Sequence, residues 1–342
     1  MASVPALVPT LGRPRTAAFF APSGYLPEPA VVQGATAYLA ARGWQVAVAE
    51  GVGERYQRFA GTDERRLADL QRWAGDPTVD VAIAARGGYG LSRLLDRIDY
   101  AAIGAAGRVV VGYSDFTAFN LALLARAGGV SFQGPSAADF ARGAEEEFTV
   151  GQFFAALSQE EHSVEFETGE TRPELAALDV RGRLWGGNLS MVCALLGTPY
   201  FPRVRGGILF LEDVNEPAYR IERLFLQLLQ AGVIGRQKAV LLGDFSSMPV
   251  LPTDNGYDLA AVWAALRARC AVPLVGGLPL GHARHRATLA VGAAARLAVR
   301  ADPAQAAGAT RVRLQFKGHP TFCEVAEPDQ ERAAPADRKI GA

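Results

Sequence analysis

The sequence predicts a two-domain α/β protein, with a parallel sheet in the first half and a β-rich, mixed domain in the second. Its 342 residues exceed one ordinary hydrophobic core and fit about two domains of typical size. In the first half, short apolar segments alternate with helical segments, and this alternation favours a parallel sheet covered by helices. The second half carries more strand signals, several of them strongly apolar.

In the first half, four strands are expected, each followed by turn residues or a helix. The strands are residues 17–21, 44–49, 79–84 and 108–112. The helices are residues 29–42, 62–73, a segment starting at Gly90 with a leucine face (Leu91, Leu94, Leu95), and residues 116–127. The third strand is continuously apolar, which is typical of a central parallel strand buried on both faces.

In the second half, the expected strands are residues 176–184, 207–211, 239–243, 288–298 and 310–316. The expected helices are residues 188–196, 218–229 and 259–269. These elements predict an N-terminal arm (1–16), an α/β domain (17–142), a charged inter-domain crossing (143–175), a C-terminal domain (176–323) and a disordered tail (324–342).

Composition excludes several classes of protein. The 35 basic and 35 acidic residues give a formal net charge of zero, so we expect no nucleic-acid or membrane-surface partner. Three scattered cysteines, without a C-x-x-C pair, argue against a disulfide framework or a cysteine metal site and favour the reducing cytoplasm. No segment reads as a membrane span or a secretory signal.

The candidate nucleophile is Ser114, in the stretch Val110-Val111-Gly112-Tyr113-Ser114-Asp115. A strand followed by Gly-x-Ser and then a helix is the arrangement of a nucleophile elbow, in which a sharp turn lifts the serine oxygen out of the sheet. Unpaired N–H groups in the first helical turn can then hold an oxyanion. Because the usual second glycine is missing, a simple helix N-cap is the alternative.

A serine nucleophile needs a base and an acid that orients it. Of four histidines, His162 lies in the charged crossing, where we expect it at the solvated surface, and His319 lies in a turn near the tail. His282 and His285 share a loop after Gly281, and local sequence leaves the choice between them open. For the acid, Glu212 and Asp213 end an apolar strand, where active sites of α/β folds gather. Two further carboxylates lie nearby, Glu216 and Glu222.

A glycine-rich stretch, Arg86-Gly87-Gly88-Tyr89-Gly90, joins the third strand to the segment that follows. It matches neither common phosphate-binding motif. A close-packed turn is one interpretation, and a backbone oxyanion donor is another, because glycine lets the main chain approach a substrate. A non-catalytic nucleotide- or phosphate-binding module is the alternative function that this loop suggests.

Several stretches together resemble the LD-carboxypeptidases, the S66-type serine peptidases, and they keep their order over about residues 17–320. These stretches are Ala21-Pro22-Ser23-Gly24-Tyr25, Arg86–Gly90, Gly112-Tyr113-Ser114-Asp115-Phe116-Thr117, Gln133-Gly134-Pro135, Leu184-Trp185-Gly186-Gly187-Asn188-Leu189, Leu211-Glu212-Asp213, Tyr219-Arg220-Ile221-Glu222-Arg223 and Gly281-His282.

The resemblance implies a triad of Ser114, His282 and Glu212 in a cleft between the two domains. It also implies oxyanion donors in the N–H of Asp115 and in Gly87 or Gly88. The implied reaction, which needs no cofactor or metal, releases the terminal D-alanine from a murein tetrapeptide during cytoplasmic peptidoglycan recycling. Homodimers are usual in the family.

Four residues are candidates for lining the substrate cleft: Arg86, Tyr113, Trp185 and Asn188. Arg86 would face the anionic C-terminus of the substrate. A rival within the same family is a self-immunity hydrolase that cleaves a peptide-nucleotide antibiotic with the same triad and a different pocket.

Overall fold

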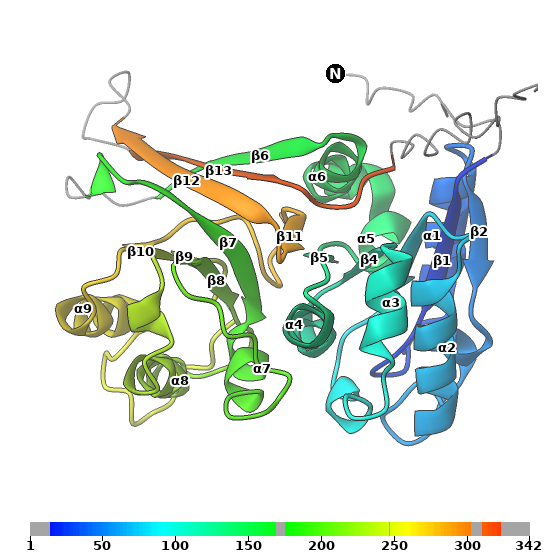
Figure 1. Ribbon diagram of the computed structural model, residues 1–342. Helices are drawn as coiled ribbons and strands as arrows, with labels where there is room; N and C mark the ends of the chain where they lie inside the picture. Colours follow the sequence, from blue (N-terminus) through cyan, green and yellow to red (C-terminus); the bar gives the residue numbers. More distant parts are fainter. Residues whose placement is uncertain (1–13, 169–174, 246, 302–309, 323–342) are drawn as a thin grey trace, which may run out of the picture.

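The computed structural model describes residues 14–168, 175–245, 247–301 and 310–322. Its strands form two sheets, which lie side by side in Figure 1, with helices around them. The predicted fold class is confirmed: the first sheet is mainly parallel and the second is mixed. The expected tail lies outside the described residues, as does all of the expected arm except residues 14–16.

The first sheet has the strand order β11-β5-β4-β3-β1-β2. Its strands are β1 (Thr16–Phe20), β2 (Gln45–Val48), β3 (Val81–Ala84), β4 (Val109–Gly112), β5 (Ser131–Gln133) and β11 (Leu289–Val291). All neighbours are parallel except β11, which runs antiparallel to β5. The central strands β3 and β4 are buried along their whole length, as their continuous apolar sequence predicts.

The helices around this sheet are α1 (Ala30–Ala40), α2 (Asp63–Gly75), α3 (Tyr100–Ala106), α4 (Thr117–Ala127), α5 (Ala137–Arg142) and α6 (Glu147–Ser158). The helix expected from Gly90 is wrong, because Leu91–Arg93 form only a 3₁₀ turn. The next α-helix starts at Tyr100, where the Asp99 side chain accepts a hydrogen bond from the N–H of Ala102.

The second sheet has the order β10-β9-β8-β7-β12-β13-β6. Its strands are β6 (Glu161–Glu167), β7 (Asp179–Asn188), β8 (Ile208–Glu212), β9 (Ala239–Leu242), β10 (Leu274–Val275), β12 (Ala294–Ala301) and β13 (Thr310–Lys317). Strands β7 to β10 are parallel, and β6, β12 and β13 pair antiparallel. Its helices are α7 (Leu189–Ala194), α8 (Ala218–Gln230) and α9 (Leu259–Arg269).

The strand expected over residues 288–298 is two strands in different sheets. Gly292, with φ +102°, turns the chain between β11 in the first sheet and β12 in the second. A side chain at this φ would be strained, so the glycine permits the change of sheet.

The expected crossing, 143–175, is more structured than its charge suggests, because it holds α6 and the edge strand β6. His162 on β6 is buried, not solvated: its Nε2 lies 3.0 Å from Oε1 of Gln152, and its ring packs against Phe316. Burial, with a smaller contribution from His319, lowers the pKa of His162 to about 4. Within the described ranges, every helix is too short or too polar to cross a bilayer.

Candidate active site

Ser114 stands at the carboxyl end of β4, at the start of the 3₁₀ turn that leads into α4. Its φ is +62°, a left-handed conformation that few non-glycine residues adopt. Such strain is typical of a nucleophile elbow and persists only where the surrounding structure enforces it. The conformation therefore favours the elbow over an ordinary helix cap.

The carboxylate of Asp115 fastens the glycine-rich loop to this turn. It is buried and accepts hydrogen bonds from Ser23 Oγ (2.6 Å) and from the N–H of Leu91 (2.9 Å). Burial raises the pKa of Asp115, and these two hydrogen bonds partly oppose that rise. The side chain thus has a structural task, and only its backbone N–H remains a candidate oxyanion donor.

Gly87 of the glycine-rich loop lies directly against Ser114. A Cβ atom at this position would lie 2.8 Å from Ser114 Cβ and 3.1 Å from Ser114 Oγ. No other residue type fits without displacing the loop or the serine, so the contact explains why glycine stands here. Gly88 has φ +84° and lies against Gly24 instead.

Glu212 and His282 meet in the second half of the chain. His282 Nδ1 lies 3.0 Å from Oε2 of Glu212, the last residue of β8, whose side chain is completely buried. Oε1 of Glu212 has no hydrogen-bond partner among the described residues, so its one polar contact is the histidine. A carboxylate held in this way fixes the ring orientation and leaves Nε2 free to act as a base.

The other local candidates have different partners. His285 packs against the ring of Phe148, Glu216 pairs with Arg220 at 2.9 Å, and Glu222 accepts a hydrogen bond from the Tyr257 hydroxyl. Asp213 accepts hydrogen bonds from Asn188, Ser190 and the N–H of Val214. Of the candidate bases His282 and His285, it is therefore His282 that contacts a candidate carboxylate, and that carboxylate is Glu212.

Tyr113 links the two halves of the site. Its ring centroid lies 5.2 Å from that of His282, and it immediately precedes Ser114. Close by, the N–H of Asn188 donates to Thr117 Oγ1 (3.0 Å), which joins the end of β7 to the first turn of α4. Gly187, with φ +143°, lets the end of β7 approach α4 closely, since a Cβ there would lie 2.4 Å from Thr117 Oγ1.

The remaining candidates occupy different surroundings. Arg86 is exposed beside the glycine-rich loop, and its guanidinium donates to the carbonyl of Tyr25. Trp185 is completely buried and donates through Nε1 to Gln237, so its side chain belongs to the core and not to a cleft. Asn188 is also buried, and its side chain caps α7 through the N–H of Met191.

Two family models cover most of the chain. The LD-carboxypeptidase N-terminal domain matches residues 17–134, and the LD-carboxypeptidase C-terminal domain matches residues 181–297. The chain belongs to the LD-carboxypeptidase family. As a member of this family it is an enzyme of the carboxypeptidase type.

Individual relatives agree with this assignment. A Streptomyces coelicolor protein named as a carboxypeptidase is 38% identical over 82% of this chain and 89% of its own length. The murein tetrapeptide carboxypeptidase of Pseudomonas aeruginosa is 32% identical over 69% of this chain and 78% of its own.

Solved structures share the fold of this LD-carboxypeptidase family member. Muramoyltetrapeptide carboxypeptidase from Oxalobacter formigenes superposes with a TM-score of 0.80 at 41% identity, covering 90% of this chain and 100% of that one. The microcin C7 self-immunity protein MccF has a TM-score of 0.77 at 22% identity, covering 93% and 100%. At that lower identity, the likeness to MccF shows a shared fold and nothing further.

Proposed function

We propose that this enzyme is a serine LD-carboxypeptidase that removes the terminal D-alanine from the murein tetrapeptide L-Ala-D-Glu-meso-diaminopimelate-D-Ala. The proposal rests chiefly on the 3.0 Å contact between His282 Nδ1 and the buried Glu212. Ser114 lies in a strained turn, and the residue before it, Tyr113, packs its ring against that of His282. The names of the relatives from P. aeruginosa and O. formigenes support the same substrate.

In the proposed reaction, Nε2 of His282 takes the proton of Ser114 as the serine oxygen attacks the carbonyl between diaminopimelate and D-alanine. Glu212 stabilises the imidazolium that forms. The oxyanion is held by the N–H of Asp115 and by Gly87 or Gly88, each such donor being worth about 3 kcal/mol of barrier. His282 then returns the proton to the leaving amine, and water releases the acyl group from Ser114.

The substrate's carboxylates need a cation, and the exposed guanidinium of Arg86 beside the oxyanion loop is the candidate for that contact. Tyr113 would line the same cleft. The proposed setting is the cytoplasm, in the recycling of cell-wall peptide, and the proposed assembly is a homodimer.

The decisive experiment compares two substrates. We expect purified protein to release D-alanine from murein tetrapeptide, and Ser114→Ala to lower the rate by about 10⁴-fold or more while circular dichroism shows an intact fold. An aminoacyl-sulfamoyl adenylate is the second substrate. Cleavage of the adenylate without D-alanine release would overturn the proposal in favour of a self-immunity hydrolase.

Two observations speak against a non-catalytic nucleotide-binding module. Family membership makes the chain an enzyme, and Gly87 of the loop that suggested a phosphate site packs against Ser114. Nucleotide binding without any turnover, unchanged in Ser114→Ala, would reopen that alternative.

A further inference from the structure

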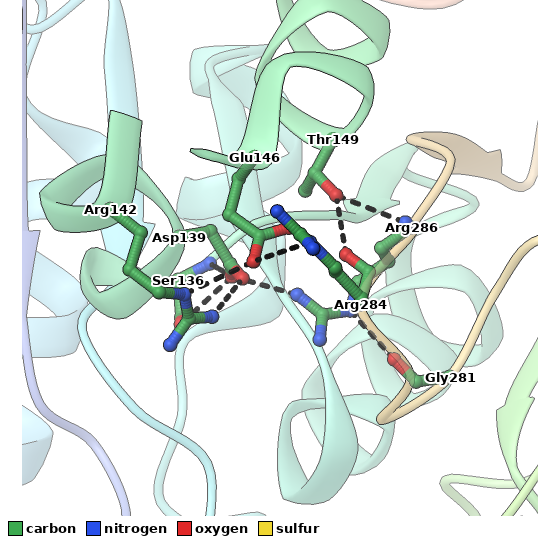
Figure 2. A network of polar contacts seen from close by, with 8 residues as sticks. All are labelled: Ser136, Asp139, Arg142, Glu146, Thr149, Gly281, Arg284 and Arg286. Atoms are coloured by element: carbon green, nitrogen blue, oxygen red, sulfur yellow. Dashed lines mark hydrogen bonds and ion pairs between the residues drawn. The ribbon is translucent and has the colours of Figure 1, made fainter. Parts of the chain in front are cut away.

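A buried arginine, Arg286, lies four residues after the histidine of the proposed triad. Its side chain is almost fully enclosed, with 3% of the residue exposed. The guanidinium donates through Nε to the carbonyl of Gly281 (2.7 Å) and through one terminal nitrogen to Oδ2 of Asp139 (2.7 Å). Figure 2 shows it between the loop that carries Gly281 and the helix that carries Asp139.

Asp139 is held in place by contacts that do not involve Arg286. It closes the capping box of α5, accepting from the N–H of Ser136 (2.8 Å) and from Ser136 Oγ (3.1 Å). Its other oxygen accepts from Arg142 (3.1 Å). The acceptor for Arg286 therefore sits at a fixed point of the first half of the chain (Figure 2).

The same guanidinium packs on Tyr113. Its central carbon lies 3.9 Å from the centroid of that ring, and the ring in turn touches His282. One side chain thus contacts Gly281, which precedes His282, and Tyr113, which precedes Ser114. A planar guanidinium can stack on a ring while two of its N–H groups donate, whereas a lysine ammonium cannot.

Holding the loop to the first half does not by itself require this guanidinium. Thr149 Oγ1 of α6 accepts from the backbone N–H of Arg286 (3.0 Å) and donates to the carbonyl of Arg284 (3.2 Å). Those two hydrogen bonds use only the backbone of the loop. In addition, a buried ion pair is often no more stabilising than apolar residues of the same size, so stability alone is a weak reason for this one.

We propose that Arg286 is a positioning residue that sets His282 against Ser114, by fixing Gly281 and Tyr113 at once from the Asp139 anchor. The proposal rests on the function proposed above for Ser114 and His282. Arg286 touches no substrate in this arrangement and acts through its two neighbours.

The test uses full-length Arg286→Ala, with Arg284→Ala as the matched control, because Arg284 lies on the same loop but is exposed and 4.0 Å from Glu146. We expect Arg286→Ala to lower kcat for murein tetrapeptide about 50-fold or more, with KM within threefold. Arg286→Lys should not restore kcat, because it cannot stack and donate twice. Free guanidinium, well below denaturing concentration, should restore at least tenfold.

A second readout does not depend on the substrate. In protein with ¹⁵N-labelled histidine, the Nδ1–H signal of His282, assigned by its absence in His282→Gln, should weaken in Arg286→Ala and return with guanidinium. If the wild type shows the signal but releases no D-alanine, the proposed function fails while the positioning role is still measured. Should Arg286→Ala not fold, Asp139→Asn replaces it and should lower kcat in the same way.

Three results would overturn the proposal. They are an unchanged kcat in a folded Arg286→Ala, a rise in KM at constant kcat, and an Nδ1–H signal identical to that of the wild type.

Discussion

Replacing Gly87 with alanine is the sharpest single test of the oxyanion role proposed for the glycine-rich loop. The added Cβ would lie 2.8 Å from Ser114 Cβ, 3.1 Å from Ser114 Oγ and 3.2 Å from the carbonyl of Tyr113. All three atoms belong to Tyr113 and Ser114, and the atoms at 2.8 Å and 3.2 Å, Ser114 Cβ and the Tyr113 carbonyl, cannot move away by a side-chain rotation. The loop and the elbow must therefore move apart.

The size of that movement gives the expected loss. An ordinary Cβ contact starts at 3.4 Å, so the two parts must separate by about 0.6 Å from the 2.8 Å contact. Oxyanion donors work at about 2.7–3.1 Å, and a shift of this size carries a donor beyond that range. Losing one donor costs about 3 kcal/mol, so we expect kcat to fall about 10²–10³-fold in Gly87→Ala.

The assay measures D-alanine release together with the melting temperature. Gly53→Ala is the matched control, because a Cβ at Gly53 would meet no atom of the described residues within 4 Å and the φ of Gly53 is not positive. It should keep kcat within twofold of the wild type. If Gly87→Ala also keeps kcat within twofold, with an unchanged melting temperature, the loop supplies no oxyanion donor and the reasoning is wrong.

Three further predictions follow from the same geometry. Glu212→Gln should lower kcat about 10²–10⁴-fold with little change in KM, since the carboxylate orients the histidine and does not reach the substrate; equal losses in binding and turnover would contradict this. His282→Asn should abolish D-alanine release while His285→Asn keeps it within twofold, and the reverse order would exchange their roles. The pKa of buried His162 is about 4, below its ordinary value of 6.5, so the unfolded chain binds a proton more readily and stability falls as pH falls from 6.5 to 4. From this group alone, urea unfolding should give about 2 kcal/mol less stability at pH 5 than at pH 7.5, and His162→Gln should lack that part of the pH dependence.

The parallel sheet and its elbow could be predicted from sequence because the relevant signals are local. Strands such as β3 and β4 are short, continuously apolar and buried, and glycine and serine mark the turns after them. Glu212 could be predicted as a strand end for the same reason, because it directly follows four apolar residues of β8. Local sequence does not identify the histidine that pairs with Glu212, because His282 and His285 lie on the same loop, three residues apart. Only the contact between His282 and Glu212 in the folded protein distinguishes the two.

Other features depend on contacts between distant residues and have no local signal. Trp185 is followed by two glycines, which suggests an open site, yet its strand β7 pairs with β8 and its Nε1 donates to Gln237, so the side chain is completely buried. From sequence, Arg286 is an ordinary basic residue of a loop. In the folded protein its terminal nitrogen donates to Asp139, which lies 147 residues earlier in the chain. His162 lies among charged residues, but the period of β6 turns it inward.

The position of β11 has a consequence for how the enzyme folds. This three-residue strand is encoded between two segments of the second half, yet it completes the edge of the first sheet beside β5. A ribosome that has finished residues 17–142 has therefore not yet made the strand that closes their sheet. The edge of the first sheet beside β5 is paired only once residue 291 has been made, so we expect the two halves to reach their native state together and to unfold in one cooperative step.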